Sequence, residues 1–468
     1  MEIIKTILNE WKERNFPKIL IRDFDIGKYV SSKLNKIIVL NGFRRVGKTY
    51  ILLNEINELL KKYSKKEVVY LNFEDERIPL KKEFLSELIP EIIKLNGEIP
   101  KFLFLDEIQN FPEWSKWLRR VYDLYPNMKL FVTGSSSKMS LNKIPTELRG
   151  RYLLNRIFPL SFKEFLRFKG FNGELNQNKL INLFEEYLVY GGLPEVVLSE
   201  KNDKLEIAKS YYSSVVNRDL IEIYNIRNKE SMKAILNLLV DSTSYSYNKM
   251  YNSLKSLQYE IGKNTLIEYI NFIEDSFFMF SIPIFSYKIK DRMQYPKKNY
   301  FIDNVFLSKI STNFSNNYGR FYENLVAINL LKGEEEFFYW KNEKNEEVDF
   351  VIKKGKKVER LIQVCYDLKN SETFDREIRA LLKASKDLKC KNLVVINKDK
   401  EGVLEKEWFG IKEKIKFVPL WKWCLEEMNK KDVLDLIKTG EKVISDINYL
   451  DKREKDILKS KKDKGLFW

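Results

Sequence analysis

The sequence contains no histidine at all and only three cysteines. The cysteines, Cys365, Cys390 and Cys424, show none of the paired spacings of metal-binding motifs. Since zinc sites are built mainly from cysteine and histidine, a zinc site is excluded, and so is a catalytic triad based on histidine. So few cysteines in a chain of 468 residues are typical of a reduced, cytoplasmic protein.

Long hydrophobic runs are also missing. No window holds the roughly 18 uncharged apolar residues that a membrane-spanning helix needs. The first residues, MEIIKTILNEWKERNFPK, carry charges among their apolar positions, which does not fit a secretory signal peptide. We therefore expect no membrane segment and a cytoplasmic location.

Basic residues, by contrast, are in excess. Lysine and arginine number 83 against 67 aspartates and glutamates, for a formal net charge of +16. Such an excess favours a polyanionic partner such as nucleic acid, or an anionic membrane surface, but a lysine-rich surface in water explains it equally well. At 468 residues, of which 44% are hydrophobic, the chain is long enough for roughly two to four domains.

The clearest chemical signal lies in residues 36–52, KIIVLNGFRRVGKTYIL. An apolar strand leads into the pattern G-x-x-x-x-G-K-T and a helical run follows, which is the context that a phosphate-binding loop requires. The glycines let backbone N–H groups turn toward phosphate oxygens. We expect Lys48 to contact the β- and γ-phosphates of ATP and Thr49 to join the shell of a Mg²⁺ ion. The predicted loop consists of Gly42, Phe43, Arg44, Arg45, Val46, Gly47, Lys48 and Thr49.

A second apolar strand ends in two acids, in KFLFLDEIQN. Asp106 is expected to hold Mg²⁺ through water, and Glu107 to polarise the attacking water as general base. Alone, such a strand end also fits two solvated acids. Downstream of a phosphate-binding loop, it predicts the second half of an ATPase site.

Two further apolar runs, residues 67–75 and 129–137, read as buried strands. Four short strands separated by helices predict an α/β fold with a parallel sheet and helices on both faces. Because the carboxyl ends of parallel strands share one crevice, Thr133, Ser135 or Ser136 could sense the γ-phosphate. A polar turn after a core strand explains each of them equally well.

Two arginines, Arg149 and Arg151, follow these strands in ELRGRYLLNRIFPLSFKEF. A guanidinium against the γ-phosphate can raise the rate of hydrolysis on the order of 10³-fold or more. Both are therefore candidates for catalysis, although most arginines are simply surface residues.

The motifs NGFRRVGKT, LFLDEIQN, FVTGSSS, LRGRY, PLSFKEF and YGGLPEVV occur in this order. The series resembles the archaeal and bacterial AAA-type ATPases that are fused to a poorly characterised C-terminal domain, and the resemblance covers nearly the whole chain. By this likeness Arg44 matches the usual arginine of the loop, and Arg151 matches the arginine after the glycine. Phe43 departs from the proline often found there, which is expected to alter loop stiffness rather than function.

The resemblance also implies a domain order. It predicts a P-loop AAA-type ATPase core, a helical lid, a winged-helix segment, a C-terminal α/β domain similar to restriction endonucleases and Holliday-junction resolvases, and a basic helical tail. The expected ranges are 1–154, 155–229, 230–304, 305–425 and 426–468.

Residues 230–304 themselves read as three helices followed by two strands, at 277–285 and 298–303, around a basic turn. That is the plan of a winged helix, which docks one helix in the DNA major groove and sets its wing on the backbone. The third helix, residues 263–276, is rich in acids, so any binding should be largely independent of sequence. A structural role between the other domains is an alternative. The turn carries Lys288, Lys290, Arg292, Lys297 and Lys298, which would suit phosphate contacts.

The last third reads as helix, three strands, helix and strand, the order of a nuclease-like core. In active members of such folds an acid on the second strand and an E-x-K pair on the third bind Mg²⁺, often with a helix glutamate. By the resemblance, Asp349 and Glu323 fill two acid positions. In the E-x-K pair of the third strand, however, Gln363 replaces the acid and Cys365 replaces the lysine. A neutral amide brings no charge to a hard cation, and cysteine cannot replace an ammonium group. We therefore expect this domain to be inactive as a nuclease.

Together these features predict a Mg²⁺-dependent ATPase that couples ATP hydrolysis to nucleic-acid binding through the winged helix and the inactivated nuclease-like domain. The alternatives are an ATP-driven signalling switch that recruits a protein partner, and an active nuclease with a rearranged site. The expected ligands are ATP, Mg²⁺ and nucleic acid, without a membrane. The oligomeric state is left open, with a homo-oligomer among the expected forms.

Overall fold

The computed structural model describes residues 2–16, 19–135, 148–173, 175–310, 318–368 and 371–426. Its first part is a five-stranded sheet in the order β2-β3-β4-β1-β5, in which every neighbouring pair is parallel. The predicted α/β fold with a parallel sheet is confirmed. The strands are β1 (Ile37–Gly42), β2 (Val68–Asn72), β3 (Phe102–Asp106), β4 (Lys129–Ser135) and β5 (Tyr152–Ile157).

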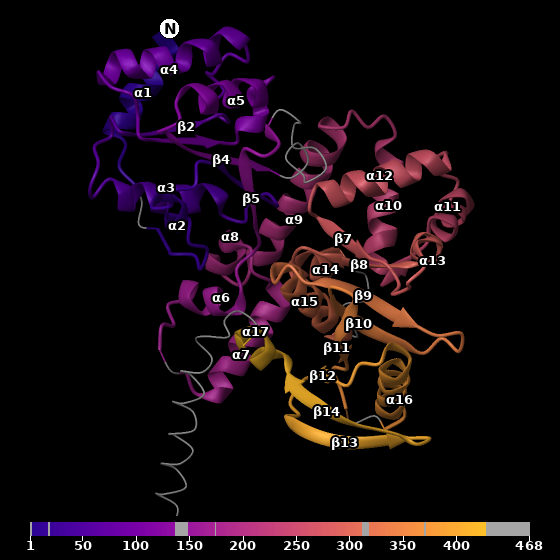
Figure 1. Ribbon diagram of the computed structural model, residues 1–468. Coiled ribbons are helices and arrows are strands. Elements are labelled where there is room, and N and C mark those ends of the chain that lie inside the picture. The colour runs from indigo at the N-terminus through magenta and orange to yellow at the C-terminus, as the bar shows by residue number, and fades with distance from the viewer. Residues whose placement is uncertain are drawn as a thin grey trace, which may run out of the picture.

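Helices cover both faces of this sheet, because its buried strands present apolar side chains alternately to either side. Ile37 and Val39 pack against one group of helices, and Ile38 and Leu40 pack against the helix on the other face. The first group is α1 (Glu2–Glu13), α4 (Lys82–Asn96) and α5 (Trp114–Leu124), and the opposite helix is α3 (Lys48–Leu59) (Figure 1). Two short helices, α2 (Gly27–Val30) and η1 (Ile108–Asn110), lie in the connections.

A helical segment follows β5. Its first helix begins with a capping box, in which the Ser161 hydroxyl accepts the Glu164 N–H and the Glu164 carboxylate accepts the Ser161 N–H. The segment consists of α6 (Phe162–Phe168), α7 (Gln177–Tyr190), α8 (Pro194–Leu198), α9 (Lys204–Ser214) and the π-helical stretch η4 (Val215–Glu222).

The middle segment joins three helices to a small antiparallel sheet in the order β6-β8-β7. The turn between the last two strands contains a short helix that the sequence did not predict. The elements are α10 (Lys229–Asp241), β6 (Ser244–Tyr245), α11 (Tyr247–Ser256), α12 (Lys263–Asp275), β7 (Met279–Ile282), α13 (Ile289–Gln294) and β8 (Lys297–Phe301).

The C-terminal segment is built on a six-stranded mixed sheet in the order β13-β14-β12-β11-β10-β9. The expected order of helix, three strands, helix and strand is present, and two more strands follow it. The elements are α14 (Asn304–Ile310), α15 (Tyr318–Lys332), β9 (Glu336–Lys341), β10 (Glu347–Lys354), β11 (Lys357–Val364), α16 (Ser371–Leu388), β12 (Leu393–Asn397), β13 (Gly402–Trp408), β14 (Ile411–Pro419) and α17 (Leu420–Glu426). The predicted basic tail lies outside the described residues, apart from Glu426.

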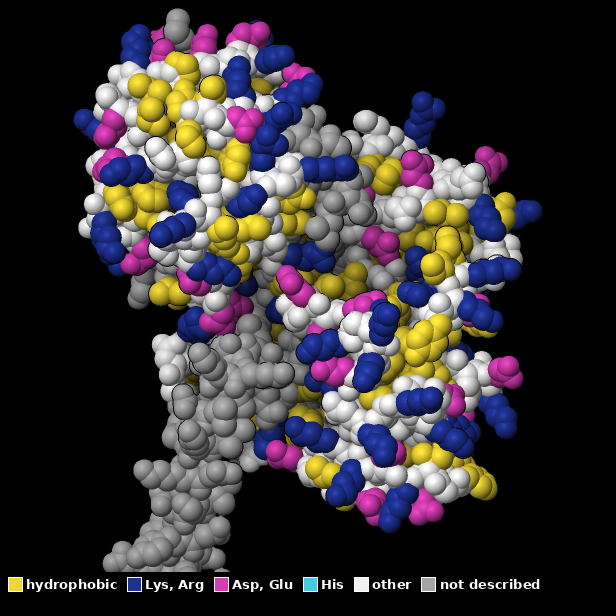
Figure 2. Space-filling model, in the orientation of Figure 1, with side chains coloured by type: hydrophobic (Ala, Val, Ile, Leu, Met, Phe, Trp, Pro, Cys, Tyr) yellow, Lys and Arg dark blue, Asp and Glu magenta, His cyan; other side chains and the backbone are white. Residues whose placement is uncertain are grey.

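The surface bears on the two explanations of the net charge. On the face shown in Figure 2, lysine and arginine side chains are scattered over all parts of the molecule and interspersed with acidic ones. This face therefore fits a lysine-rich solvated surface better than one large basic patch. None of the described helices is both long and apolar enough to cross a membrane.

Candidate nucleotide site

The loop between β1 and α3 takes a shape that only glycine allows at two positions. A Cβ atom on Gly42 would lie 2.2 Å from the carbonyl oxygen of Ile157 on the neighbouring strand. Gly47, just before α3, has a φ of 95°, in the left-handed region that glycine adopts without strain. The two glycines of the predicted motif are thus required by the packing of β5 and by the turn into the helix.

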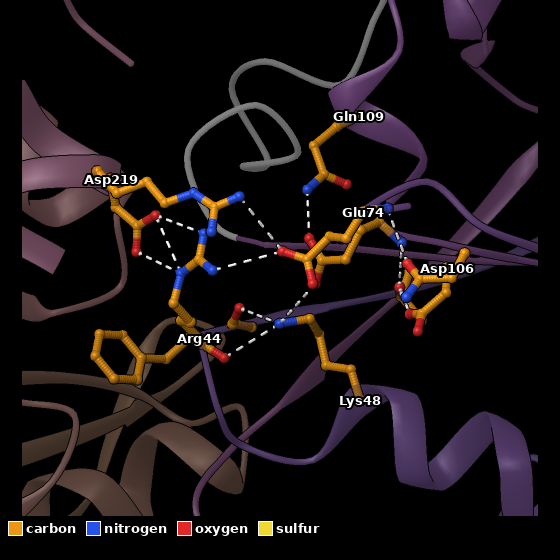
Figure 3. A network of polar contacts seen from close by, with 12 residues as sticks. Arg44, Lys48, Glu74, Asp106, Gln109 and Asp219 are labelled. Atoms are coloured by element: carbon orange, nitrogen blue, oxygen red, sulfur yellow. Dashed lines mark hydrogen bonds and ion pairs between the residues drawn. The ribbon is translucent and has the colours of Figure 1, made fainter. Parts of the chain in front are cut away.

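Lys48 lies at the start of α3 with only 5% of its surface exposed. Its ammonium donates hydrogen bonds to the carbonyl oxygens of Gly42 and Phe43, both at 3.2 Å, and lies 3.6 Å from a carboxylate oxygen of Glu107 (Figure 3). A buried ammonium is therefore placed between the loop and the end of β3.

Asp106 ends β3 and is 1% exposed. The hydroxyls of Tyr70, at 2.9 Å, and of Thr133 donate to its two oxygens, and the nearby Thr49 hydroxyl favours its ionised form. Burial, reinforced by the charge of Glu107, raises the pKa of Asp106 above its usual range. The oxygen-rich pair of Thr49 and Asp106 fits a Mg²⁺ ion, whose charge would keep this buried carboxylate ionised.

Glu107 follows with a φ of 52°, a left-handed conformation that is uncommon for residues other than glycine. Its backbone N–H donates to the Thr133 hydroxyl at 2.9 Å, and its carboxylate accepts a hydrogen bond of 2.5 Å from the Gln109 amide. Thr133 therefore contacts both acids and positions them. Ser135 ends β4, while Ser136, the remaining hydroxyl candidate, lies outside the described residues.

The arginines of the loop contact the helical segment. The Arg44 guanidinium donates to the Asp219 carboxylate of η4 at 3.0 and 3.2 Å and lies 3.6 Å from Glu74 (Figure 3). The Arg45 guanidinium stands 5.6 Å from the centre of the Tyr211 ring of α9. Both arginines thus join the loop to the helical segment.

Phe43 and Val46 are the buried apolar side chains of the loop, at 1% and 0% exposure. The Phe43 ring lies 6.2 Å from that of Phe278 and 5.5 Å from that of Phe306, measured between ring centres. These contacts reach the middle segment and α14. Phe43 therefore packs the loop against the rest of the molecule.

Arg22 is a contact of the loop that sequence reasoning missed. Its guanidinium donates to the carbonyl oxygens of Val46 at 2.6 Å and Phe158 at 2.9 Å, and pairs with the Glu164 carboxylate at 2.6 Å. Burial raises the pKa of Glu164, but the charge and hydrogen bonds of Arg22, together with the Lys332 charge and the Ser161 N–H, outweigh burial and lower that pKa to about 2. The S-x-x-E capping pattern at Ser161 was the only signal, and it predicts a helix start rather than this pair.

Arg149 and Arg151 do not join the site in their own chain. Arg151 precedes β5, and its carbonyl oxygen accepts the N–H of Ile37, at the start of β1. The nucleotide loop begins at the other end of β1, roughly 17 Å away at about 3.3 Å per residue. Arg149 is exposed, and Arg151 pairs with Asp123 at 3.1 Å. A role at the γ-phosphate of the same chain does not fit this placement.

The residues assigned to a nuclease-like site do come together. Glu323 and Asp349 both contact Lys298, and the Gln363 amide oxygen accepts the Asp349 N–H at 3.3 Å. Cys365 is buried among apolar side chains, where burial raises the pKa of its thiol to about 11. Lys298 itself is 5% exposed, so the expectation that it would contact phosphates from the turn is wrong.

Comparison with known families agrees with this site. A family model described as an AAA domain matches residues 34–166, which contain the loop and both acids. The first part of the chain therefore has an AAA-type P-loop ATPase fold. Two further models, both described as domains of unknown function (DUF8612 and DUF4143), match residues 181–317 and 318–423.

Among individual relatives, the uncharacterised protein MJ1544 of Methanocaldococcus jannaschii is 39% identical over 436 residues, covering 90% of this chain and 94% of the relative. An uncharacterised protein of Haemophilus influenzae is 28% identical, covering 71% and 83%. Among solved structures, the Walker-type ATPase PABY2304 of Pyrococcus abyssi matches 62% of this chain and 96% of its own, with a TM-score of 0.42 and 16% identity. That structural likeness carries no conclusion about function.

Proposed function

This chain belongs to the same family as MJ1544 of Methanocaldococcus jannaschii, and we propose that it binds ATP with Mg²⁺ and hydrolyses it. The observation that carries the proposal is the meeting of Lys48, Thr49, Asp106 and Glu107 at the carboxyl ends of β1 and β3. The AAA-domain match over residues 34–166 supports it.

Each residue has a role in this proposal. Lys48 leaves the carbonyl oxygens of Gly42 and Phe43 to contact phosphate oxygens, and its departure frees the Glu107 carboxylate to accept a proton from water. Thr49 and Asp106 would hold Mg²⁺, which neutralises charge on the phosphates when bound. Thr133 and Gln109 orient the two acids.

The test is ATP binding and hydrolysis by two variants. Lys48→Ala is expected to lose tight ATP binding, whereas Glu107→Gln should bind ATP and lose hydrolysis on the order of 10²-fold or more, since its amide cannot accept the proton. The control is Lys62, an exposed lysine just after the end of α3, and Lys62→Ala should bind and hydrolyse ATP as wild type does. Normal hydrolysis by Glu107→Gln would show that the general base is misassigned.

Four further units complete the proposal: a lid at 155–229, a winged helix at 230–304, an inactivated nuclease-like domain at 305–425 and a basic tail at 426–468. The order α10-β6-α11-α12-β7-β8 with its three-stranded sheet supports the winged helix, and the order α15-β9-β10-β11-α16-β12 supports the nuclease-like domain. In this proposal ATP hydrolysis drives nucleic-acid binding by these units.

A protein-recruiting switch is the second candidate, and the surface of the middle segment favours it. The exposed residues of α12 include Glu268 and Asn271 but only one lysine, Lys263, and Lys298 is withdrawn from the turn. Running the same assay with duplex, branched and single-stranded nucleic acids separates the two. An ATPase rate that no nucleic acid alters would favour the switch, and a rate increase that weakens steeply with salt would favour nucleic acid.

A homo-oligomer is part of the proposal as well. Arg149 and Arg151 lie at the amino ends of the strands, whereas the loop follows the carboxyl end of β1, so they can reach a γ-phosphate only if it is bound by a neighbouring copy of the chain.

A further inference from the structure

Lys298 of β8 reaches out of the small sheet into a group of carboxylates that belong to the C-terminal segment. Its ammonium lies 2.8 Å from Glu323 of α15, 2.6 Å from Glu347 and 2.7 Å from Asp349, both of β10. Only 5% of Lys298 is exposed. One buried cation is therefore surrounded by oxygens from three acidic side chains.

Two of the three carboxylates, those of Glu323 and Asp349, also accept hydrogen bonds from groups other than the lysine. The Tyr300 hydroxyl donates to Glu323 at 2.7 Å, and the N–H of Val364 donates to the second oxygen of Asp349 at 2.9 Å. The side chains of Glu323 and Asp349 are only 17% and 10% exposed, so their charges are largely removed from water. These acids would thus be poorly stabilised without a cation between them.

The lysine occupies the place in which a metal ion would be expected. Glu323 and Asp349 are the two acids that match metal-binding positions by the resemblance to nuclease-like folds, and a cavity of about 440 Å³ borders both of them together with Gln363 and Glu377. In the structure as it stands, with Lys298 between the acids, the described residues contain no group of three or more acidic or cysteine side chains that could hold a metal ion. The cavity would give an ion a route to these oxygens.

We propose that Lys298 is a built-in substitute for a divalent cation, and that the site formed by Glu323, Glu347 and Asp349 accepts Mn²⁺ or Mg²⁺ only when the lysine is withdrawn. A purely structural ion network is the alternative, because a buried lysine paired with acids also occurs without any metal role. The proposal rests on the nuclease-like placement of Glu323 and Asp349, but it requires neither ATP hydrolysis nor DNA cleavage.

The placement of Lys298 also makes the site depend on the middle segment. The lysine belongs to β8, which pairs with β6 and β7, whereas all three acids belong to the C-terminal segment. A movement of β8 would therefore change the charge and the access of this site.

The experiment removes the ammonium and asks whether a metal ion replaces it. Methionine keeps most of the apolar stem but ends one atom short of the nitrogen, so Lys298→Met vacates the place between the oxygens. Calorimetry on nucleotide-free, full-length protein should show one Mn²⁺ bound per chain that wild type does not bind. Lys298→Met should unfold at a lower temperature than wild type, and Mn²⁺ should restore most of the loss.

Two controls locate the effect. Lys297→Met, on the same strand, should gain no Mn²⁺ site, since its ammonium faces Tyr247 rather than the acids. Adding Asp349→Asn to Lys298→Met should remove the new site while leaving Mn²⁺ binding elsewhere, such as at Asp106, unchanged. The proposal is overturned if Lys298→Met binds no additional Mn²⁺, if it stays unfolded with and without Mn²⁺, or if wild type already binds Mn²⁺ at the site that Asp349→Asn removes.

Discussion

Arg44 and Asp219 connect the nucleotide loop to the helical segment through one buried ion pair. The Asp219 side chain is 2% exposed and that of Arg44 is 17% exposed, so the pair is largely shielded from water. Asp219 lies in η4, and such π-helical stretches often occur at functional sites. Any change in the loop on nucleotide binding will therefore act on this helix through Arg44.

A double-mutant cycle should reveal this coupling. We expect Asp219→Ala to lower the free energy of unfolding by about 1–3 kcal/mol, because it leaves the guanidinium without its main partner. Arg44→Ala should cost a similar amount, and the double variant little more than either single one, as for two residues that act as a pair. Urea unfolding measures all three, with exposed Glu222→Ala in η4 as control. Additive losses would mean that the two residues act separately.

Thr133 and Arg22 show which contacts of the nucleotide site could be predicted from the sequence and which could not. The sequence named Thr133 as a candidate for sensing the γ-phosphate, and the structure adds that its hydroxyl contacts Asp106 and Glu107. Arg22 was not predicted at all, because its partners Val46, Phe158 and Glu164 meet only through folding. Short motifs name the reacting groups, but not the side chains that hold them.

Helix α3 combines the phosphate-binding loop with a second cavity. Beyond Lys48 and Thr49, the helix presents Tyr50, Asn54 and Glu55 to a partly open space of about 140 Å³ that the segment around residues 20–26 also lines. Burial, with the charges of Asp25 and Glu58, raises the pKa of Glu55 to about 7. The helix therefore carries a carboxyl group with a pKa near neutrality about two turns beyond Lys48.

Glu55 should make stability depend on pH in a definite direction. Its folded-state pKa is about 7 against an ordinary value of 4.5, so the folded protein binds more protons in this window, and stability falls as the pH rises from about 4.5 to 7. Glu55→Gln should therefore match wild type near pH 5 and exceed it near pH 8. Because the cavity is open to water, the gain should be only about 1–2 kcal/mol.

Unfolding in urea at both pH values measures this gain, with Glu83→Gln on the exposed side of α4 as the matched control. Equal stability of Glu55→Gln and wild type at pH 8 would show that Glu55 is not destabilising when ionised.

Strand β8 gives its two neighbouring lysines, Lys297 and Lys298, different surroundings. Alternation along the strand turns Lys297 and Lys298 to opposite sides, so neighbouring lysines meet different surroundings. Lys297 approaches Tyr247, whereas Lys298 meets three acids. In the sequence, Lys297 and Lys298 read as parts of one basic turn. In the strand, the pleat directs one of them toward the surface and the other into the interior.

At the level of the complete chain, one hydrophobic cluster extends from the nucleotide-binding sheet to the C-terminal sheet. It includes Leu40 of β1, Leu220 of η4, Ile270 of α12 and Ile396 of β12. The Phe43 ring of the loop lies within it, against Phe278 and Phe306. The parts of the molecule are therefore packed on each other, which gives ATP binding a physical route to the distant segments.

Arg149 and Arg151 lead to a prediction about assembly. If they act on a neighbouring copy, Arg149→Ala/Arg151→Ala should lose hydrolysis on the order of 10³-fold, as expected when a guanidinium leaves the γ-phosphate, while still binding ATP. Mixing this variant with inactive Lys48→Ala should restore part of the rate, since each supplies what the other lacks.

Exposed Arg119 and Arg120 on α5 provide the control, and their double alanine variant should keep the wild-type rate. An inactive arginine variant that mixing does not rescue would argue against action between copies, and an active one would remove both arginines from catalysis.

The sequence by itself determined the parallel α/β fold, the loop from Gly42 to Thr49 and the acids at the end of β3, because contiguous residues carry the strand pattern, the turn glycines and the reactive groups. It also predicted the helices of the middle segment and the replacement of a strand acid by Gln363. Tertiary structure alone decided that Arg151 lies at the amino end of the sheet, away from the loop, and that Lys298 fills the acidic site. Those outcomes depend on which surfaces meet when segments far apart in the chain bury their apolar sides together, and no local pattern encodes that choice.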